Sequence, residues 1–214
     1  DQDPKALENA LKQITKFDCT FACDITKKGS AEKVMHNAIL NFGGIDILIS
    51  NAGNATSGLM LELDDKKLRK AFELNFFAHK SFAVEAAKIM KLQKRGGQIL
   101  FNISKQAINP GSKMGAYGLP KATTMFLMRQ LALELGNDKI RVNGVCPVAG
   151  ETPMLKDFLG SSNPEENHKK FISTVPLGRL AEPRDVANAA LYLCSEEADF
   201  ITGVMLEIDG GRTI

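Results

Sequence analysis

Apolar residues follow two alternating spacings along this chain, and each spacing indicates a different element. Apolar positions three and four residues apart predict helices. These helical segments are residues 4–14, 31–42, 64–94, about 115–135 and 183–194. Short apolar runs bounded by turn-forming residues predict strands. These runs are residues 19–23, 45–50, 98–104, 139–146 and 201–208.

The alternation of strands and helices predicts one α/β domain. Strand–helix–strand units form parallel sheets with right-handed crossovers. A nearly continuous apolar run such as 45–50 is typical of a strand covered on both faces. The stretch 147–176 has no clear period and is expected to contain at least one short helix. Within it, we expect residues 154–175 to form a mobile lid over a substrate.

Composition narrows the class of protein further. The chain has 214 residues, of which 44% are hydrophobic and 24% charged, as in a soluble globular domain. Twenty-seven Lys and Arg against 25 Asp and Glu give a net charge of +2, so we expect no nucleic-acid partner. No run approaches the ~20 apolar residues of a membrane span, and no secretory signal is visible. We therefore expect no membrane partner.

The cysteines indicate a reducing compartment. They form no C-x-x-C pair and lie in apolar runs, at Cys19, Cys23, Cys146 and Cys194. Buried free thiols in the cytoplasm fit this pattern, whereas a disulfide framework does not. We predict a cytoplasmic protein that binds no metal.

Three positions stand at or just past the ends of predicted strands. In open parallel sheets, ligands bind beyond the carboxyl ends of the strands. Asn51, Ser104 and Pro147 occupy such places. The turn formed by Asn51, Ala52 and Gly53 lets a flat ligand approach the backbone closely, although this tripeptide alone is a common turn.

Tyr117 and Lys121 have the spacing of a general acid–base pair. Residues four apart lie on one face of a helix. A phenol has a pKa of about 10, and a nearby ammonium lowers that pKa because it favours the phenolate. On spacing alone, an exposed tyrosine and a surface lysine remain the simpler interpretation. Ser104 either donates to a substrate oxygen or merely ends a strand, and Asn75 is either functional or a hydrogen-bonded core amide.

Together these residues resemble the short-chain dehydrogenase/reductase family. Each motif alone is weak, but jointly they match the order and spacing of that family over essentially the whole chain. The matching motifs are Asp24, Asn51-Ala52-Gly53, Asn75, Ser104, Tyr117-x-x-x-Lys121, Asn143, Pro147-x-x-x-x-Thr152, Pro176-Leu177-Gly178-Arg179-Leu180, Pro183-x-Asp185-Val186-Ala187, Ile201-Thr202-Gly203 and Asp209-Gly210-Gly211. The resemblance implies a Rossmann-like doubly wound parallel sheet in three layers.

The resemblance also implies catalytic roles for four residues. Tyr117 would be the general acid for carbonyl reduction and the base for alcohol oxidation. Lys121 would lower the pKa of Tyr117 and hold the nicotinamide ribose, while Ser104 would polarise the substrate oxygen. Asn75 would hold a water in a proton relay, with a local bulge in its helix.

Cofactor contacts follow from the same resemblance. Asp24 and Ile25 would border the adenine, and the turn 51–53 would line the cofactor's path. Pro147 would lie near the nicotinamide and Thr152 would bind its carboxamide. Asp1 occupies the place of the family's acid that binds the adenine ribose diol and repels a 2′-phosphate, so we expect NAD, with NADP possible.

The start of the chain departs from the family. The glycine-rich phosphate turn, G-x-x-x-G-x-G, is absent. Counting back from Asp1, we expect roughly 30 residues upstream that carry the first two strands. Residues 1–214 would then be one Rossmann domain that is incomplete at its N-terminus and lacks its first strands.

Three further departures concern the site. Val148 replaces the family's glycine after Pro147. Lys105 follows Ser104 where the family has a small residue, which suggests an anionic or polyhydroxylated substrate unless this lysine points to solvent. Pro120 precedes Lys121, and because proline is tolerated only in the first turn of a helix, the helix is expected to start late.

These features predict a nicotinamide-dependent dehydrogenase or reductase acting on an alcohol or carbonyl compound. The segments 104–111, 117–122 and 127–130 resemble the dehydrogenase half of bifunctional sugar-phosphate aldolase/dehydrogenases, which favours a hydroxyaldehyde or sugar-derived substrate. The alternatives are a 3-oxoacyl thioester reductase and a non-catalytic nucleotide-binding sensor, although a sensor would be expected to lose Tyr117 or Lys121. A serine hydrolase is disfavoured because no G-x-S-x-G surrounds Ser104. The resemblance implies a homodimer or homotetramer.

Overall fold

The structure, a computed structural model, describes residues 1–13, 19–155, 158 and 163–214. Helix α1 spans Pro4–Gln13 and α2 spans Ser30–Phe42, close to the predicted bounds, and residue 14 of the first predicted helix lies outside the described residues. Gly43 caps the end of α2, and its φ of 77° is the left-handed conformation that glycine adopts without strain. In the described part of the chain, no helix is both long enough and apolar enough to cross a membrane.

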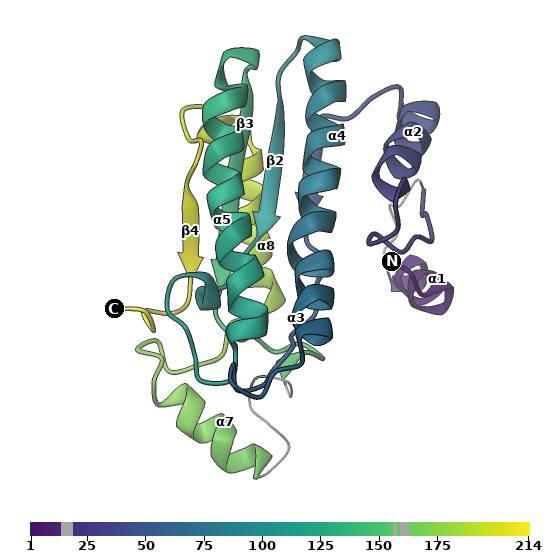
Figure 1. Ribbon diagram of the computed structural model, residues 1–214. Helices are drawn as coiled ribbons and strands as arrows, with labels where there is room; N and C mark the ends of the chain where they lie inside the picture. The colour runs from purple at the N-terminus through teal and green to yellow at the C-terminus, as the bar shows by residue number, and fades with distance from the viewer. Residues whose placement is uncertain (14–18, 156–157, 159–162) are drawn as a thin grey trace.

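The described residues contain one parallel sheet, which lies at the centre of the molecule. Its strands are β1 (Ile47–Ser50), β2 (Gly97–Asn102), β3 (Ile140–Pro147) and β4 (Met205–Ile208), hydrogen-bonded in that order. All neighbouring pairs are parallel. Their carboxyl ends therefore meet at one edge, which points downward in Figure 1.

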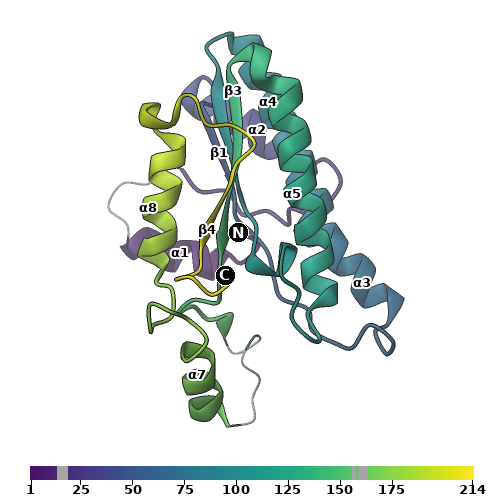
Figure 2. The ribbon, with the colours of Figure 1, turned by 90° about the vertical axis from the view of Figure 1, so that its left-hand side faces the viewer.

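Helices cover the sheet on both faces, so the fold has the three layers that the sequence predicts. Figure 2 shows α4 (Ala78–Gln93) and α5 (Gly115–Leu135) on one side of the strands and α8 (Pro183–Cys194) on the other. Helix α7 (Pro164–Ile172), the short helix expected in the irregular stretch, lies beyond the carboxyl edge of the sheet. This arrangement confirms the α/β prediction.

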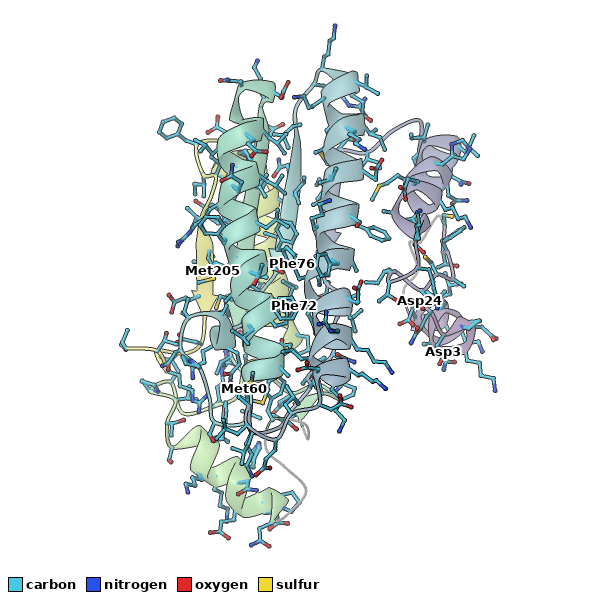
Figure 3. The ribbon with its side chains drawn as sticks, in the orientation of Figure 1. Asp3, Asp24, Met60, Phe72, Phe76 and Met205 are labelled. Carbon is cyan, nitrogen blue, oxygen red and sulfur yellow. The ribbon has the colours of Figure 1, made fainter. Side chains whose placement is uncertain are left out.

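The long predicted helix 64–94 forms with an interruption. Helix α3 (Asp65–Phe72) passes into a π-helical turn, Glu73–Phe77, before α4 begins. Asp64 caps α3, because its side chain accepts a hydrogen bond from the backbone N–H of Lys66 at 2.8 Å. Phe72 and Phe76, labelled in Figure 3, meet edge to face with ring centroids 6.4 Å apart.

Two apolar clusters hold the layers together. The larger lies between the sheet and helices α4 and α5, and includes Met90, Phe101, Met128 and Val142, all fully buried. A smaller cluster of Leu100, Val145 and Leu193 joins α8 to the opposite face. Burying one such side chain contributes roughly 1.5–3 kcal/mol.

The predicted strand 19–23 is wrong for the described residues. This segment has no regular secondary structure, and the described backbone gives it one hydrogen bond to another extended segment, from Cys23 N–H to the Asp1 carbonyl at 2.8 Å. A strand needs a continuous ladder to a neighbour. Because no described strand flanks this segment, its apolar residues do not form one, and Phe21 is exposed.

Strand β1 is less covered than its apolar run predicts. Ile47 and Ile49 are 47% and 55% exposed. Ile49 pairs with Leu100 and therefore points to the face that α8 covers over β2 to β4. Since α8 does not extend over β1 and no described strand pairs with its outer edge, only Leu48 packs into the main core.

Two smaller expectations also differ. The prediction of buried thiols holds for Cys146, whereas Cys19, Cys23 and Cys194 are partly buried, all of them free. Helix α5 starts at Gly115 and continues through Pro120, so the predicted late start is wrong. Pro120 lacks the N–H that would bond back along the helix, and it is buried within α5.

Candidate active site

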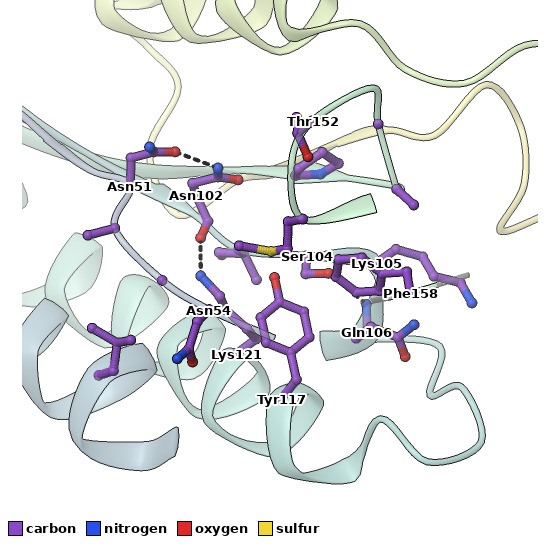
Figure 4. A pocket seen from close by; sticks show the side chains of 18 of the residues that line it. Asn51, Asn54, Asn102, Ser104, Lys105, Gln106, Tyr117, Lys121, Thr152 and Phe158 are labelled. Atoms are coloured by element: carbon purple, nitrogen blue, oxygen red, sulfur yellow. Dashed lines mark hydrogen bonds between the residues drawn. The ribbon is translucent and has the colours of Figure 1, made fainter. Parts of the chain in front are cut away.

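A cavity of about 1300 Å³ opens at the carboxyl edge of the sheet. Its walls come from the ends of β1, β2 and β3, from the first turns of α5, and from the segments around α7. Figure 4 shows the side chains that converge on it. Most of the sequence-predicted site residues line this cavity: Asp1, Asp24, Ile25, Asn51, Ala52, Gly53, Ser104, Tyr117, Lys121, Pro147 and Thr152.

Tyr117 stands in the first turn of α5 and is buried. Its hydroxyl points toward Ser104 in Figure 4. Burial raises the pKa of the Tyr117 phenol above its ordinary value, and hydrogen bonding with Ser104 opposes this rise only in part. The phenol is therefore protonated at neutral pH and suited to donate a proton.

Lys121 lies one turn further along α5, on the same face. It is 3% exposed, and its Nζ donates a hydrogen bond to the carbonyl of Asn102 at 2.6 Å. Nζ is 5.9 Å from the centre of the Tyr117 ring. Burial lowers the pKa of Lys121 to about 8. Spacing alone left a surface lysine possible, and the structure excludes it.

The expected effect of Lys121 on the Tyr117 pKa is wrong for the protein alone. The sequence predicts a lowered pKa for this phenol, but the pKa is raised, because desolvation is the largest influence on it. The ammonium of Lys121 is instead directed at the Asn102 carbonyl. Removal from water disfavours the charged form of each group, which raises the pKa of the phenol and lowers that of the ammonium.

Ser104 follows β2 and caps a short 3-10 helix, Lys105–Ala107. Its backbone is extended, with φ 178° and ψ 151°, and its Oγ accepts a hydrogen bond from the N–H of Gln106 at 3.3 Å. The Ser104 hydroxyl is also hydrogen-bonded with the Tyr117 phenol, so the two hydroxyl groups face the same point in the cavity. The cap explains why a serine at this strand end is held in one orientation.

Asn75 lies in the π-helical turn, which confirms the expected bulge. It is fully buried, and its amide makes two hydrogen bonds with the backbone of Asn54, accepting from N–H at 3.3 Å and donating to the carbonyl at 3.1 Å. The hydroxyl of Thr124 donates to the Asn75 carbonyl at 2.9 Å. Asn75 therefore fixes the loop after β1, while its role in a proton relay stays a prediction.

We expect Asn75→Ala to loosen this loop. The substitution removes both hydrogen bonds to the backbone of Asn54, and a typical intramolecular hydrogen bond contributes about 0.5–1.5 kcal/mol. Urea unfolding should show a lower free energy of unfolding than for wild type. Asn188→Ala, on the exposed face of α8, is the matched control and should change it by less than about 0.5 kcal/mol. Equal stabilities of the two variants would contradict the role given to Asn75.

The turn after β1 is shaped by close packing. A Cβ atom at Gly53 would lie 2.8 Å from Oδ1 of Asn75 and 3.7 Å from Nζ of Lys121, so glycine is required there. Asn51 Oδ1 accepts a hydrogen bond from Asn102 Nδ2 at 2.6 Å. The turn is thereby tied to the neighbouring strand and leaves backbone open to the cavity.

Two polar residues beneath the site were missed by the sequence analysis. Asn102 Oδ1 and His79 Nε2 are buried and have no hydrogen-bond partner among the described residues. Nδ1 of His79 lies 2.6 Å from the hydroxyl of Ser50, and burial lowers the His79 pKa to about 3, so this ring is neutral. A polar residue inside an otherwise apolar strand or helix was the available signal for both.

The departure after Pro147 has a local explanation. Gly150 forms an isolated parallel bridge with Ala181, and Glu151 N–H donates to the Ala181 carbonyl at 2.9 Å. A Cβ atom at Gly150 would lie 2.7 Å from that same carbonyl oxygen. The glycine is needed where the chain crosses the segment before α8, while Val148 at the earlier position is buried.

Comparisons with known proteins agree with this geometry. Residues 1–213 match a family model described as enoyl-(acyl carrier protein) reductase. The chain is 35% identical over 197 residues to 4-formylbenzenesulfonate dehydrogenase TsaC1/TsaC2 of Comamonas testosteroni, covering 91% of this chain and 77% of that protein. It is also 35% identical over 190 residues to 7alpha-hydroxysteroid dehydrogenase of Escherichia coli K12, covering 88% of this chain and 72% of that one.

Solved structures give the same result. A 7α-hydroxysteroid dehydrogenase complexed with NADH and 7-oxo glycochenodeoxycholic acid matches with a TM-score of 0.87 and 33% identity, over 97% of this chain and 79% of that one. A 3-ketoacyl-(acyl-carrier-protein) reductase from Brucella melitensis complexed with NADH matches with a TM-score of 0.91 and 31% identity, over 100% of this chain and 86% of that one. The chain belongs to the short-chain dehydrogenase/reductase family. It is an oxidoreductase of the NAD(P)-dependent type.

Proposed function

We propose that this protein transfers a hydride reversibly between a nicotinamide cofactor and a secondary alcohol or its carbonyl compound. The observation that carries the proposal is the convergence of Tyr117, Ser104 and Lys121 on one cavity at the carboxyl edge of the sheet. A phenol and a hydroxyl that face one reacting oxygen are what proton transfer to that oxygen needs. Family membership supports the same chemistry.

The cavity residues fit a dinucleotide. The cavity has a volume of about 1300 Å³, which exceeds the ~300–1,000 Å³ of a typical single-ligand pocket. It therefore has room for cofactor and substrate together. Nζ of Lys121, the unpartnered Oδ1 of Asn102 and the bare turn at Gly53 offer polar groups and close approach on one side. Asp24 and Ile25 would border the adenine, and Pro147 and Thr152 would lie near the nicotinamide. When bound, the cofactor supplies or accepts the hydride.

NAD is the cofactor that the site supports better than NADP. Asp1 lines the cavity on the side of Asp24 and Ile25, and its Oδ1 accepts a hydrogen bond from the N–H of Asp3 at 2.9 Å. This bond leaves carboxylate lone pairs for a ribose diol. A 2′-phosphate would be repelled by the same charge.

Tyr117 and Ser104 have different roles at the substrate oxygen. The protonated phenol donates to the oxygen as carbonyl reduction proceeds, and Ser104 holds that oxygen with a second hydrogen bond. Ring packing of Phe158 edge-on against Tyr117, with centroids 5.6 Å apart, helps to keep the phenol in place. In oxidation of an alcohol the same residues act in the reverse direction.

The finer substrate class remains part of the proposal. The two named relatives act, by their names, on a formyl-substituted arene and on a hydroxysteroid. The resemblance to aldolase-linked dehydrogenases supports a hydroxyaldehyde or sugar-derived substrate.

A second candidate function is reduction of a 3-oxoacyl thioester, which is favoured by the likeness to the Brucella reductase.

An assay of cofactor oxidation tests the proposal directly. Purified protein would be mixed with NADH or NADPH and an aromatic aldehyde, a 3-oxosteroid, a hydroxyaldehyde or an acetoacetyl thioester, and the loss of reduced-cofactor absorbance followed. We expect turnover with NADH to exceed turnover with NADPH. Cofactor binding by calorimetry without turnover on any of these carbonyls would favour the non-catalytic sensor instead.

We also propose a cytoplasmic homodimer or homotetramer. Helix α5 exposes a stripe of large apolar side chains one heptad apart, Leu119, Phe126 and Leu133, which are 45%, 69% and 81% exposed. Such a stripe suits packing against the same helix of a second copy. The four free thiols support a reducing compartment.

Phe126→Glu is expected to break this assembly. A buried carboxylate at the centre of an apolar contact is strongly unfavourable, so the variant should run as a monomer in light scattering coupled to gel filtration. Phe200→Glu, at a fully exposed position outside α5, is the control and should keep the wild-type mass. A monomeric wild type would contradict the proposal.

A further inference from the structure

Lys105 is a buried cation at the substrate end of the cavity. It follows Ser104 directly, lines the cavity and is only 9% exposed. Among the described residues, its ammonium has neither an ion pair nor a hydrogen bond within the usual limits. Figure 4 shows Lys105 on the side of Ser104 away from Asn51 and Asn102, which is the side away from the residues expected to hold the cofactor.

A second cation lines the same cavity from the C-terminal segment. The guanidinium carbon of Arg212 lies 3.9 Å from the centre of the Phe171 ring, and its Nε donates to Thr174 Oγ1 at 2.7 Å. These contacts orient the guanidinium plane. In the described part of the chain, its two terminal nitrogens have no hydrogen-bond acceptor.

The two cations influence each other, and the nearest carboxylate is already engaged. The charge of Arg212 lowers the pKa of Lys105, after the larger effect of burial. Asp209 lies near both, but its oxygens accept from the N–H groups of Gly211 at 2.9 Å and Thr213 at 2.7 Å, and from the Thr213 hydroxyl. No described carboxylate lies within 4.0 Å of either cation.

We propose that Lys105 and Arg212 bind an oxyanion carried by the substrate, so that the preferred carbonyl compound bears a carboxylate, sulfonate or phosphate group. An ammonium that is partly removed from water and has no counter-ion is unfavourable, and a bound anion offsets that cost. Arginine presents paired donors that match an oxyanion. The apolar rings of Phe158 and Phe171 lie on the cavity wall and suit the body of a substrate that joins the carbonyl to the anion.

This inference rests on the proposed function and extends it to substrate class. It is tested with a matched pair of aldehydes, 4-formylbenzoate and the neutral 4-formylbenzamide, which have nearly the same shape. For wild type with NADH we expect kcat/KM to favour the benzoate. Lys105→Met should reduce the benzoate-to-benzamide ratio of kcat/KM by about tenfold or more, as expected for loss of a charge-assisted hydrogen bond. Arg212→Leu should reduce the same ratio.

Two controls separate charge from folding. Lys105→Arg keeps the cation and should keep the ratio. Lys169→Met removes an exposed cation on α7 and should also leave the ratio at its wild-type value. Calorimetry with 4-(hydroxymethyl)benzoate should show weaker binding to Lys105→Met than to wild type.

The outcomes are distinguishable. A wild-type enzyme that reduces both aldehydes with equal kcat/KM, or prefers the benzamide, overturns the anion site and leaves the proposed function standing. An unchanged ratio in Lys105→Met also overturns it. If wild type reduces no carbonyl compound of the wider panel, the proposed function fails, and this inference fails with it.

Discussion

Tyr117→Phe is expected to abolish turnover while leaving cofactor binding nearly intact. The substitution removes one oxygen from a buried ring and keeps the edge-to-face contact with Phe158. Loss of a positioned general acid lowers rates by about 10²–10⁴-fold. The measurement is kcat for carbonyl reduction together with the dissociation constant for NADH from calorimetry.

The chain provides a matched control for this experiment. It contains two tyrosines, and Tyr192 on α8 is 45% exposed and is not among the residues that line the cavity. Tyr192→Phe should keep wild-type kcat. Activity of Tyr117→Phe above a tenth of wild type would show that another group protonates the substrate oxygen.

Lys121→Met is expected to lower both turnover and cofactor affinity. The variant keeps the length of the side chain, so the core beneath the site stays filled, but it loses the donor to the Asn102 carbonyl and the charge beside Gly53. We expect kcat/KM to fall by roughly 100-fold or more and the dissociation constant for NADH to rise about tenfold, since a charge-assisted hydrogen bond contributes about 1.5–3 kcal/mol. Lys80→Met on the exposed side of α4 should change neither.

The pH profile adds a separate readout. The pKa of Lys121 is about 8, so its ammonium is charged below that pH and is lost as the pH rises through it. In wild type, kcat/KM for reduction, which reports groups of the free enzyme, should be flat below pH 8 and decline above it. Tyr117, with its pKa raised, stays protonated over this range. An unchanged NADH affinity in Lys121→Met would exclude the ribose contact.

The same shift has a consequence for stability. Because the pKa of Lys121 is lowered from 10.5 to about 8 on folding, the unfolded chain binds more protons between these values. Wild-type stability should therefore rise with pH across this window by the contribution of this group. Lys121→Met should lack that rise, and urea unfolding at several pH values measures the difference.

Much of the fold follows from apolar spacing because most elements are packed in the way that such spacing implies. The α5 helix and strands β2 and β3 have residues buried in the pattern expected for a covered parallel sheet. At residues 19–23, apolar spacing predicts the wrong secondary structure. The apolar run of this segment predicts a strand, yet a strand is defined by its neighbours, and no described strand pairs with it.

The site was predictable to the extent that motif residues have fixed places at strand ends and on one helix face. Asn51, Ser104, Tyr117 and Lys121 meet as their spacing implies. Arg212 was missed because it lies outside every motif and reaches the cavity only through contacts with Phe171 and Thr174. The burial of Lys105 and the raised pKa of Tyr117 depend on desolvation by the whole fold, which no local pattern contains.

The π-helical turn at Glu73–Phe77 acts as a phase shift between two helices. Each residue of an α-helix advances by about 100° around the helix axis. One extra residue in the turn therefore rotates the side chains of α3 about that axis relative to the side chains of α4. Helix α3 can thus face α5 while α4 faces the sheet. Asn75 lies in the turn between these two helices. A deletion of one residue here would straighten the helix and keep its hydrogen bonds, yet turn either Asn75 or the core face of α4 out of position. At this turn the length of the chain matters as much as the identity of its side chains.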